Sequence, residues 1–283
     1  LSEWFGSGSG DYKTFWTPTS LRGLIGASLR VDVLTEGVHS GGASGHVPSS
    51  FRIARSLLSR LEDEKTGEIL IDELNTEIPG YRIEETKNLV SILNNEVVEE
   101  FPWKDNMKPS TNDNVEGVLR RTWKPAVSIV GVDGMPSTAN AGNVLRPYTT
   151  LQLSMRIPPT ANAKKAVQAM KKTLSENIPY DATVELKFEK AGEGWNAPES
   201  KPWLLEAINK ASKEYFGQMA CSMGEGGSIP FMGMLGKQFP EAQFVITGVL
   251  GPQSNAHGPN EFLHIPFAKR LTCCISSIVA DYK

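Results

Sequence analysis

The order of sequence patterns between residues 24 and 190 constrains the fold of this chain more than any other feature. Apolar and polar residues alternate from Leu21 in LRGLIGASLRVDVLT, which predicts a strand with one buried face. The same criterion predicts three later strands, and helical spacing of apolar residues predicts three helices. The strands cover 126–134, 149–159 and 182–190, and the helices cover 51–64, 84–98 and 162–177, while 103–125 reads as polar and irregular. This order predicts an α+β unit whose helices cover one face of an antiparallel sheet.

A different organisation begins at the Gly- and Pro-containing joint AGEGWNAPESKP, near residue 195. A predicted helix over 202–216, a strand over 243–250 and a final helix from about residue 266 flank two Gly-rich loops. These elements are typical of one part of a parallel α/β sheet whose other strands are not found in this segment. We therefore divide the chain into residues 1–23, 24–194 and 195–283.

Charge and composition exclude several classes of protein. Lys and Arg total 29 and Asp and Glu total 32, so a formal net charge of −3 provides no basic footprint for nucleic acid. No apolar run reaches the 18 or more residues of a membrane span, and we find no secretory signal peptide. The 3 cysteines form neither a disulfide framework nor a CxxC motif, which indicates a reducing compartment and predicts a cytoplasmic protein.

Two Gly-rich loops of the last segment contain candidate site residues. His257, in SNAHGPNE, follows a predicted strand, and open α/β sheets bind ligands beyond the carboxyl ends of their strands. In GEGGSIP, Gly226 and Gly227 let backbone N–H groups approach an anion, and Ser228 adds a hydroxyl donor. For His257 the alternative is a surface-loop histidine. For GEGGSIP the alternative is an ordinary loop, because its glycine spacing matches no phosphate-binding loop.

Two further candidates lie between residues 24 and 194. His39 stands with His46 in VHSGGASGHVP, a Gly-rich loop flexible enough to reach the site of another subunit. The spacing of these histidines matches no zinc motif, so a solvated loop is the alternative. Arg156 ends the predicted strand over 149–159 and can offer a bidentate guanidinium to a carboxylate. An edge arginine that reaches solvent is the alternative there.

Five motifs, taken in their order and spacing, resemble the carnosinase-like and cytosolic non-specific dipeptidase family of dinuclear metallopeptidases. They are SLRG, VHSGGASG, SMRIPP, GEGGSIP and NAHGPNE, which begin at residues 20, 38, 154, 224 and 255. The resemblance implies a ferredoxin-like lid, also the dimerisation domain, over 24–194. It implies the C-terminal part of an α/β zinc-peptidase-type catalytic domain over 195–283, with 1–23 as a linker and a partial strand of that domain.

The resemblance also assigns roles to individual residues. His257 matches the family's C-terminal metal-ligand histidine. His39 matches the lid histidine that crosses the dimer, polarises the scissile carbonyl and stabilises the tetrahedral oxyanion. The remaining matches are substrate-binding positions, namely Asn143, Arg156, Gly226, Gly227, Ser228 and Asn196. Of these, Asn196 stands where close relatives have a histidine.

The activity implied by the resemblance is hydrolysis of small dipeptides by a water that two Zn²⁺ or Mn²⁺ ions activate, in a homodimer. The family's His-x-Asp pair, bridging aspartate and Glu-Glu pair have no counterpart here, and Gly6 aligns with a further metal-binding aspartate. A catalytic zinc needs about three protein ligands, so we expect the chain alone to be inactive without an N-terminal catalytic half. A non-catalytic dimerisation or scaffold subunit and an N-acyl amino acid deacylase are the alternative hypotheses.

Overall fold

The computed structural model describes residues 11–255 and 258–282 and divides the chain into two compact units. The first unit contains residues 11–22, 77–123 and the described residues from 194 onward. The second unit contains residues 23–76 and 124–193. The predicted 24–194 segment includes residues 77–123, whereas the contacts of 77–123 assign them to the first unit. Chain order gave no signal for this, because the assignment depends on which sheet the helices of 77–123 pack against.

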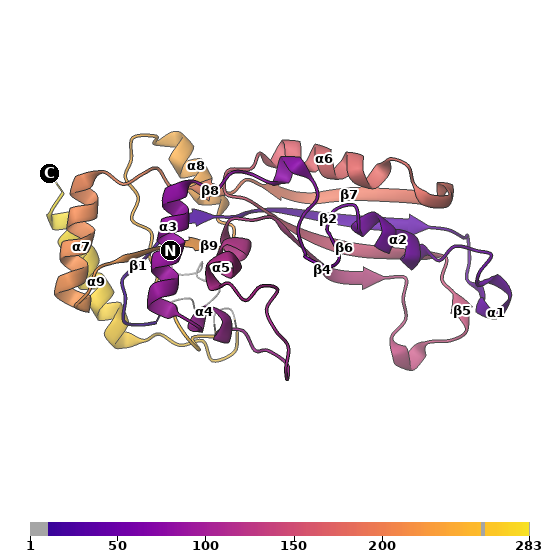
Figure 1. Ribbon diagram of the computed structural model, residues 1–283, viewed down its shortest axis with the longest axis horizontal. Coiled ribbons are helices and arrows are strands. Elements are labelled where there is room, and N and C mark those ends of the chain that lie inside the picture. The colour runs from indigo at the N-terminus through magenta and orange to yellow at the C-terminus, as the bar shows by residue number, and fades with distance from the viewer. Residues whose placement is uncertain (1–10, 256–257, 283) are drawn as a thin grey trace. The chain divides into compact units, whose positions relative to one another are not determined.

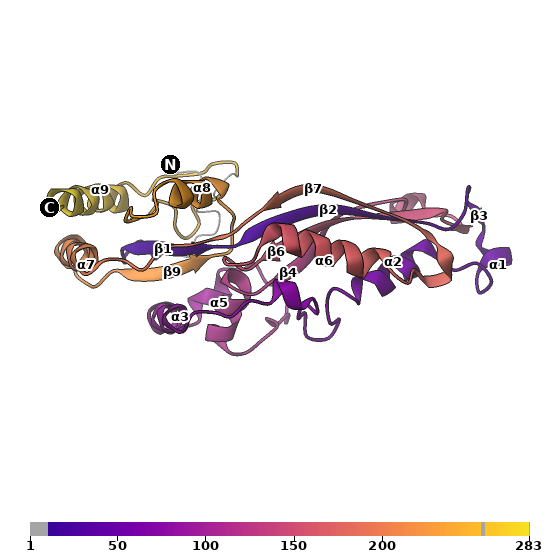
Figure 2. The ribbon, with the colours of Figure 1, turned by 90° about the horizontal axis from the view of Figure 1, so that it is seen from above.

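The second unit is built on a four-stranded antiparallel sheet in the order β4-β6-β2-β7. The strands are β2 (Gly23–Asp32), β4 (Ala126–Asp133), β6 (Tyr148–Ile157) and β7 (Thr183–Gly192). Helices α2 (Ser50–Leu58) and α6 (Ala163–Ser175) pack on one face of this sheet (Figures 1 and 2). The resulting β-α-β-β-α-β order, with the second and fourth strands outermost, confirms the predicted ferredoxin-like arrangement.

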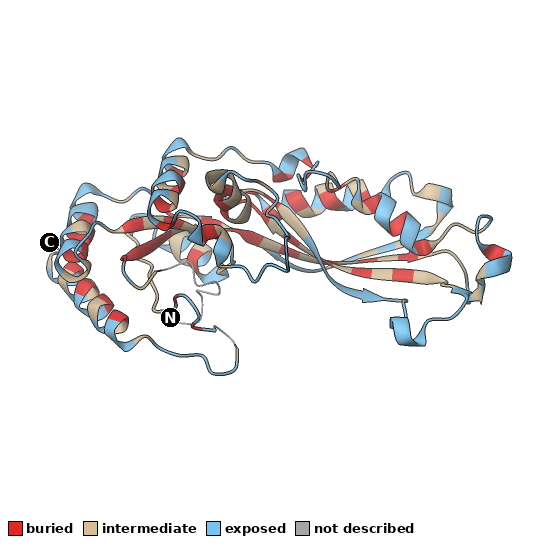
Figure 3. Ribbon diagram, turned by 60° about the horizontal axis from the view of Figure 1, so that its bottom comes forward, coloured by how far each residue is buried: buried red, intermediate tan, exposed pale blue. Residues whose placement is uncertain are grey.

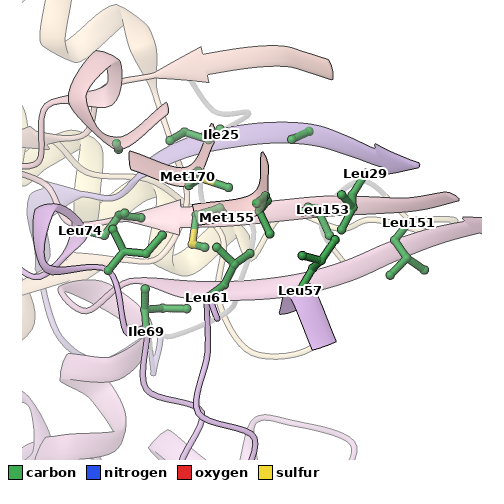
Figure 4. Packing of buried hydrophobic residues seen from close by; sticks show 14 of the residues in the cluster. Ile25, Leu29, Leu57, Leu61, Ile69, Leu74, Leu151, Leu153, Met155 and Met170 are labelled. Atoms are coloured by element: carbon green, nitrogen blue, oxygen red, sulfur yellow. The ribbon is translucent and has the colours of Figure 1, made fainter. Parts of the chain in front are cut away.

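Period-two alternation gives this sheet one buried face. Along β2 and β6 buried residues alternate with half-buried ones, as the red and tan bands of Figure 3 show. Ile25 and Met155 on these strands are 0% exposed and pack with Leu57 from α2 and Met170 from α6 (Figure 4). Burying a side chain of this size stabilises the fold by about 1.5–3 kcal/mol. This helix-covered face is therefore the main core of the second unit.

Short elements complete the second unit. Strands β3 (Val38–His39) and β5 (Val144–Leu145) pair as a two-stranded antiparallel ribbon, and the single turn α1 (Ser40–Ala43) follows β3 directly. Three 3₁₀ turns are η1 (Asp72–Leu74), η2 (Thr138–Asn140) and η3 (Pro179–Asp181). This ribbon carries His39, one of the candidate site residues.

The first unit contains a three-stranded sheet in the order β8-β1-β9. Strands β1 (Trp16–Leu21) and β9 (Cys221–Glu225) are parallel, and β8 (Trp195–Asn196) pairs antiparallel with β1. Trp16 packs with residues of α3 (Gly80–Leu93), α4 (Glu96–Glu99) and α5 (Asn114–Thr122), and neighbouring Phe15 packs with residues of α7 (Pro202–Phe216) and α9 (Ile265–Ala280). Helix α8 (Pro230–Gln238) contributes Met232 to a smaller cluster around Leu21. The predicted α/β class of this part is confirmed.

Two predictions of secondary structure differ from the structure. The segment 103–125 was predicted irregular but contains α5, whose first turn is capped by the Asp113 carboxylate accepting from the N–H groups of Val115 and Glu116. The segment 243–250 was predicted as a strand, yet within the described part of the chain it pairs with no strand. Among the described helices, none has the length and apolarity needed to cross a bilayer.

Candidate functional site

The glycine-rich loop after β9 lies where two parallel strands end together. The register pairs Leu21, the last residue of β1, with Glu225, the last residue of β9. Carboxyl ends of parallel strands are the usual ligand-binding edge of an α/β sheet. Gly226, Gly227 and Ser228 follow at once, so the structure locates this candidate loop at that edge.

Arg22 holds the loop in place. The Arg22 side chain is 8% exposed, and its Nε donates to the carbonyl of Gly226 at 3.3 Å while Nη1 donates to the carbonyl of Arg120 at 3.3 Å. The Ser228 hydroxyl donates to the Arg22 carbonyl at 2.6 Å. A serine hydroxyl has one proton, so in this arrangement Ser228 presents acceptor lone pairs rather than a donor. The backbone N–H groups are therefore the donors that this loop has to offer.

The two glycines of the loop have different surroundings. A Cβ at Gly226 would lie 2.7 Å from the Arg121 carbonyl oxygen and 3.2 Å from Arg22 Nη2, so packing alone requires glycine there. A Cβ at Gly227 would meet nothing within 4 Å, and Gly227 is exposed. Gly227 is thus the position where a substrate could approach the backbone.

Asn196, on β8, is part of a hydrogen-bond network around the buried Arg82 in the first unit. Its Oδ1 accepts from Arg82 Nε at 3.0 Å, and its Nδ2 donates to the Tyr81 hydroxyl at 3.3 Å. Arg82 is 3% exposed and also donates to the Glu85 carboxylate at 2.8 Å and to the Ala197 carbonyl at 2.9 Å. Both functional groups of the Asn196 side chain are therefore occupied by residues of α3.

His39 and Asn143 come together on the β3–β5 ribbon of the second unit. His39 pairs with Val144, and the N–H of Ser40 donates to the Asn143 carbonyl at 2.9 Å. The His39 side chain is exposed, and its Nδ1 accepts from the N–H of Gly41 at 3.1 Å. Two of the candidate residues thus lie side by side, with the imidazole oriented by a backbone contact.

Arg156 lies near the end of β6, on the sheet face opposite the helices. It pairs with Leu24 of β2 and Ala126 of β4, and its neighbours Met155 and Ile157 are buried under α2 and α6. Partial burial lowers the pKa of Arg156, but a guanidinium keeps its charge in proteins. The structure thus provides a half-buried cation on the sheet face opposite α2 and α6.

The other histidines make different contributions. His257 and Gly6 lie outside the described residues. His264 caps α9 by accepting from the Phe267 N–H at 3.1 Å, and its ring stacks on Tyr12 with 4.4 Å between centroids. Within residues 11–255 and 258–282, no cluster of three or more His, Cys, Asp or Glu side chains could hold a metal ion.

A cavity of about 580 Å³ occurs in the second unit, away from the candidate residues. Its walls come from η1 and the C-terminal half of α6, together with Arg60, whose guanidinium donates to the carbonyls of Glu176 and Asn177 at 2.6 and 2.7 Å. Arg60 therefore acts as a cap for the end of α6, and this cavity includes no candidate site residue.

The protein family of this chain follows from a match to a known family model. The model of the M20 peptidase dimerisation domain matches residues 19–182, which is more than half of the chain. The chain belongs to the M20 metallopeptidase family.

Two curated relatives of this M20 chain are dipeptidases. The cysteinylglycine-S-conjugate dipeptidase of Corynebacterium striatum is 26% identical over 263 residues, covering 89% of this chain and 54% of the relative. The Cys-Gly metallodipeptidase DUG1 of Saccharomyces cerevisiae is 30% identical over 201 residues, covering 68% of this chain and 40% of the relative. The chain thus spans about half the length, or less, of these relatives.

Solved structures of M20 and related peptidases share the fold. The dipeptidase Dug1p from Saccharomyces cerevisiae superposes with a TM-score of 0.75 at 21% identity, covering 99% of this chain and 57% of that one. Human carnosine dipeptidase 1 gives 0.70 at 17% identity, covering 96% and 57%. The metallo-carboxypeptidase Sso-CP2 from Sulfolobus solfataricus gives 0.72 at 18%, covering 92% and 58%. At these sequence identities the similarity shows a shared fold and nothing further.

Sequence reasoning missed three residues that organise the M20 candidate site. Arg22 lies within the SLRG motif but was not predicted as a site residue, although an arginine within an alternating strand pattern is a usable signal. Arg82 was missed because a helix pattern does not reveal which charge becomes buried. Gly41 was missed because its contact with the His39 ring depends on the turn geometry.

Proposed function

We propose that the chain is part of a metal-dependent dipeptidase that hydrolyses small dipeptides with a free terminal carboxylate. The observation that carries the proposal is the match, over 89% of this chain, to a cysteinylglycine-S-conjugate dipeptidase. A second Cys-Gly dipeptidase among the relatives points the same way. Dipeptides of the Cys-Gly type are therefore the first substrates to test.

Arg156 and the loop 226–228 are proposed to bind the substrate's terminal carboxylate. The half-buried Arg156 guanidinium is able to form two parallel hydrogen bonds with a carboxylate. Because Ser228 gives its proton to the Arg22 carbonyl, the exposed backbone around Gly227 is the better donor of the loop. Asn143 is proposed to contact substrate beside His39, and Asn196 is proposed to act indirectly, through Arg82 and α3.

His39 is proposed to stabilise the oxyanion that forms when water attacks the scissile carbonyl. It is exposed on the β3–β5 ribbon, from which it can reach into the site of a partner subunit in a dimer. A hydrogen-bond donor aimed at the developing negative charge acts more strongly on the transition state than on the substrate. Removing such a donor typically lowers kcat by about 10²–10³-fold.

The proposed reaction requires metal ions, and the described residues alone do not provide a site for them. Those residues contain no cluster of three or more His, Cys, Asp or Glu side chains that fits a divalent ion. We propose that two Zn²⁺ or Mn²⁺ ions bind in the complete enzyme, with His257 as one ligand and an N-terminal catalytic half supplying others. The 283-residue chain alone is then inactive, and equilibrium dialysis should find fewer than two tightly bound ions per chain.

The edge strand β4 is proposed to join two copies of the chain. Ile129, Val130 and Val132 on this strand are 45%, 64% and 53% exposed. An apolar edge strand is a template for pairing with another strand, whereas the opposite edge β7 carries Glu185 and Lys187, which discourage pairing. Because the matched family model is a dimerisation domain, a second copy is the occupant we propose, and antiparallel β4–β4 pairing gives a two-fold interface.

A substrate panel separates the enzyme hypotheses. The full-length gene product, supplied with Mn²⁺ or Zn²⁺, should hydrolyse Cys-Gly faster than its C-terminal amide, which lacks the carboxylate, and faster than an N-acyl amino acid. A preference for the N-acyl substrate would favour a deacylase instead. A stable dimer of the full-length protein without hydrolysis of either substrate class would favour a scaffold subunit.

A cytoplasmic location is also proposed. The described cysteines Cys221, Cys273 and Cys274 are all free thiols, which suits a reducing compartment. Fractionation of the source cells with an antibody against the chain tests this, and recovery from a secreted fraction contradicts it.

A further inference from the structure

We propose that the backbone N–H of Gly41 fixes the tautomer of the His39 imidazole, so that Nε2 always carries the proton and Gly41 is a positioning residue. The role of the Nε2–H group as a hydrogen-bond donor to the substrate rests on the proposed function. The tautomer itself is a property of this chain and can be measured without any catalysis.

The hydrogen bond leaves one tautomer for the neutral ring. His39 Nδ1 accepts from the Gly41 N–H at 3.1 Å, and a backbone N–H can only donate. A neutral imidazole has one protonated and one unprotonated nitrogen. Nδ1 is therefore the unprotonated nitrogen, and Nε2 carries the hydrogen.

The local backbone explains why the Gly41 N–H faces the ring. His39 is extended, with φ −60° and ψ 121°, and the turn α1 begins at the next residue. The N–H groups of a first turn have no partner within the turn, so a side chain just before it can accept from them. The turn is anchored on both sides, by the His39–Val144 pairing and by the Ser44 N–H, which donates to the Ser40 carbonyl at 2.8 Å.

Histidine is an unusual choice for this capping position. Serine, threonine, aspartate and asparagine are the preferred residues, because a short side-chain oxygen reaches the free N–H groups. A histidine here caps with one ring nitrogen and keeps the other as a donor. The cap thus couples a local structural contact to the chemistry of the exposed Nε2.

Glycine at position 41 is required by the imidazole rather than by the backbone. A Cβ there would lie 2.7 Å from His39 Cε1 and 3.0 Å from Nδ1, so any side chain would force the ring to rotate. The φ angle of Gly41 lies outside the left-handed region, so an alanine is not excluded by backbone strain. At the adjacent Gly42 a Cβ would meet nothing within 4 Å, which makes Gly42→Ala a matched control.

The fixed tautomer has a direct consequence for catalysis. With the proton on Nε2, the neutral imidazole presents a hydrogen-bond donor to a carbonyl oxygen and to the oxyanion formed from it. With the opposite tautomer, Nε2 would present a lone pair to the same oxygen and repel it. Gly41 therefore selects the tautomer of the neutral His39 ring that stabilises the transition state.

The first experiment reads the tautomer by NMR. The chain is labelled with ¹⁵N-histidine, its ring resonances are recorded by long-range ¹H–¹⁵N correlation at neutral pH, and His39 is assigned with a His39→Gln variant. We expect a pyridine-type Nδ1 and a pyrrole-type Nε2 in the unmodified chain and in Gly42→Ala. In Gly41→Ala we expect both resonances to move toward values averaged between the tautomers.

Two results overturn the inference. One is a His39 ring in the unmodified chain that is doubly protonated, protonated on Nδ1 or tautomerically mixed. The other is a Gly41→Ala chain, folded by circular dichroism, whose His39 resonances match those of Gly42→Ala. The first result does not depend on Gly41→Ala, so a folding defect of that variant leaves the inference testable.

Kinetics on the full-length gene product separate this inference from the proposed function. Gly41→Ala should lower kcat for a dipeptide with little change in KM, because the donor acts on the transition state, while Gly42→Ala should change neither. Absence of dipeptide hydrolysis together with the expected NMR signature refutes the function and keeps the tautomer. Hydrolysis with a mixed tautomer refutes the inference and keeps the function.

Discussion

Arg82 and Asn196 are joined by a hydrogen bond of 3.0 Å from the guanidinium Nε to the amide Oδ1, which ties helix α3 to strand β8. Arg82 is 3% exposed and also donates hydrogen bonds to the Glu85 carboxylate and the Ala197 carbonyl. Glu85 in turn accepts from the Thr19 hydroxyl of β1 at 2.9 Å. Asn196 is thus part of a connected polar network.

Replacing Arg82 with alanine should strongly destabilise the first unit. The change leaves Asn196, Glu85 and a backbone carbonyl without their buried cation, and breaking a buried ionic network typically costs about 3–5 kcal/mol. Lys87→Ala, on the same helix, is the control, because the Lys87 side chain is 55% exposed and its ion pair with Glu84 is solvated. Urea denaturation of both variants measures the difference, and equal unfolding free energies contradict the network's importance.

Asn196 can be tested by substitutions that keep or remove its acceptor. Asn196→Asp retains an oxygen for Arg82 Nε and should keep the unfolding free energy close to that of the unmodified chain. Asn196→Leu leaves that donor unsatisfied and should cost about 1–3 kcal/mol. If both variants unfold at the same denaturant concentration, Asn196 does not hold α3 in the way described.

Alkaline pH should weaken the fold through Cys221. Burial raises the pKa of the Cys221 thiol to about 12, with smaller contributions from Glu85 and Asp11, whereas an unfolded thiol titrates near about 8.5. Because the folded pKa is the higher one, the stabilisation is complete below about pH 8.5 and is lost as pH rises toward 12.

The slope of stability against pH measures this effect. The free energy of unfolding should fall by up to about 1.4 kcal/mol per pH unit for this one thiol above pH 9. In Cys221→Ala that contribution disappears, so its pH dependence should be flatter than that of the unmodified chain, whatever the variant's absolute stability. Parallel curves for the two proteins contradict a titrating buried thiol.

The proposed dimer depends on an uncharged β4 edge. Val130 is the residue at which the β4–β6 register shifts, and its side chain is 64% exposed. Val130→Lys should shift the protein from dimer to monomer in analytical ultracentrifugation, because a charge on an edge strand opposes pairing. Lys187→Glu on β7 should leave the dimer intact. A dimer that survives Val130→Lys and dissociates in Lys187→Glu places the interface at the wrong edge.

Sequence patterns predicted the second unit well because its core is made by regular alternation. Alternating residues of β2 and β6 needed only the period-two rule. In the first unit, the predicted helix over 202–216 matches α7 residue for residue. The helix α5 was missed because Gly117 and a polar composition hid it, although Asp113 followed three residues later by Glu116 is a capping signal.

The segment 243–250 shows where the alternation rule fails. Phe244 and Ile246 pack in the cluster around Trp195, while Val245 and Val249 pack in the cluster around Phe15. Two-sided burial therefore produces the alternation of a strand, but the rule carries no information about a hydrogen-bonding partner. Within the candidate site, the residue types and the loops that carry them could be predicted from the sequence. The Ser228 contact to Arg22 and the Gly41 contact to His39 required coordinates.

The most direct test of the account is the kcat for Cys-Gly hydrolysis by the full-length gene product with and without the His39 imidazole. We predict that the unmodified protein, supplied with Mn²⁺ or Zn²⁺, hydrolyses the dipeptide and that His39→Ala lowers kcat by about 10²–10³-fold. His46→Ala, an exposed histidine of the same loop, should leave kcat unchanged. Absence of hydrolysis in the unmodified protein, or an equal kcat in His39→Ala, would contradict the account.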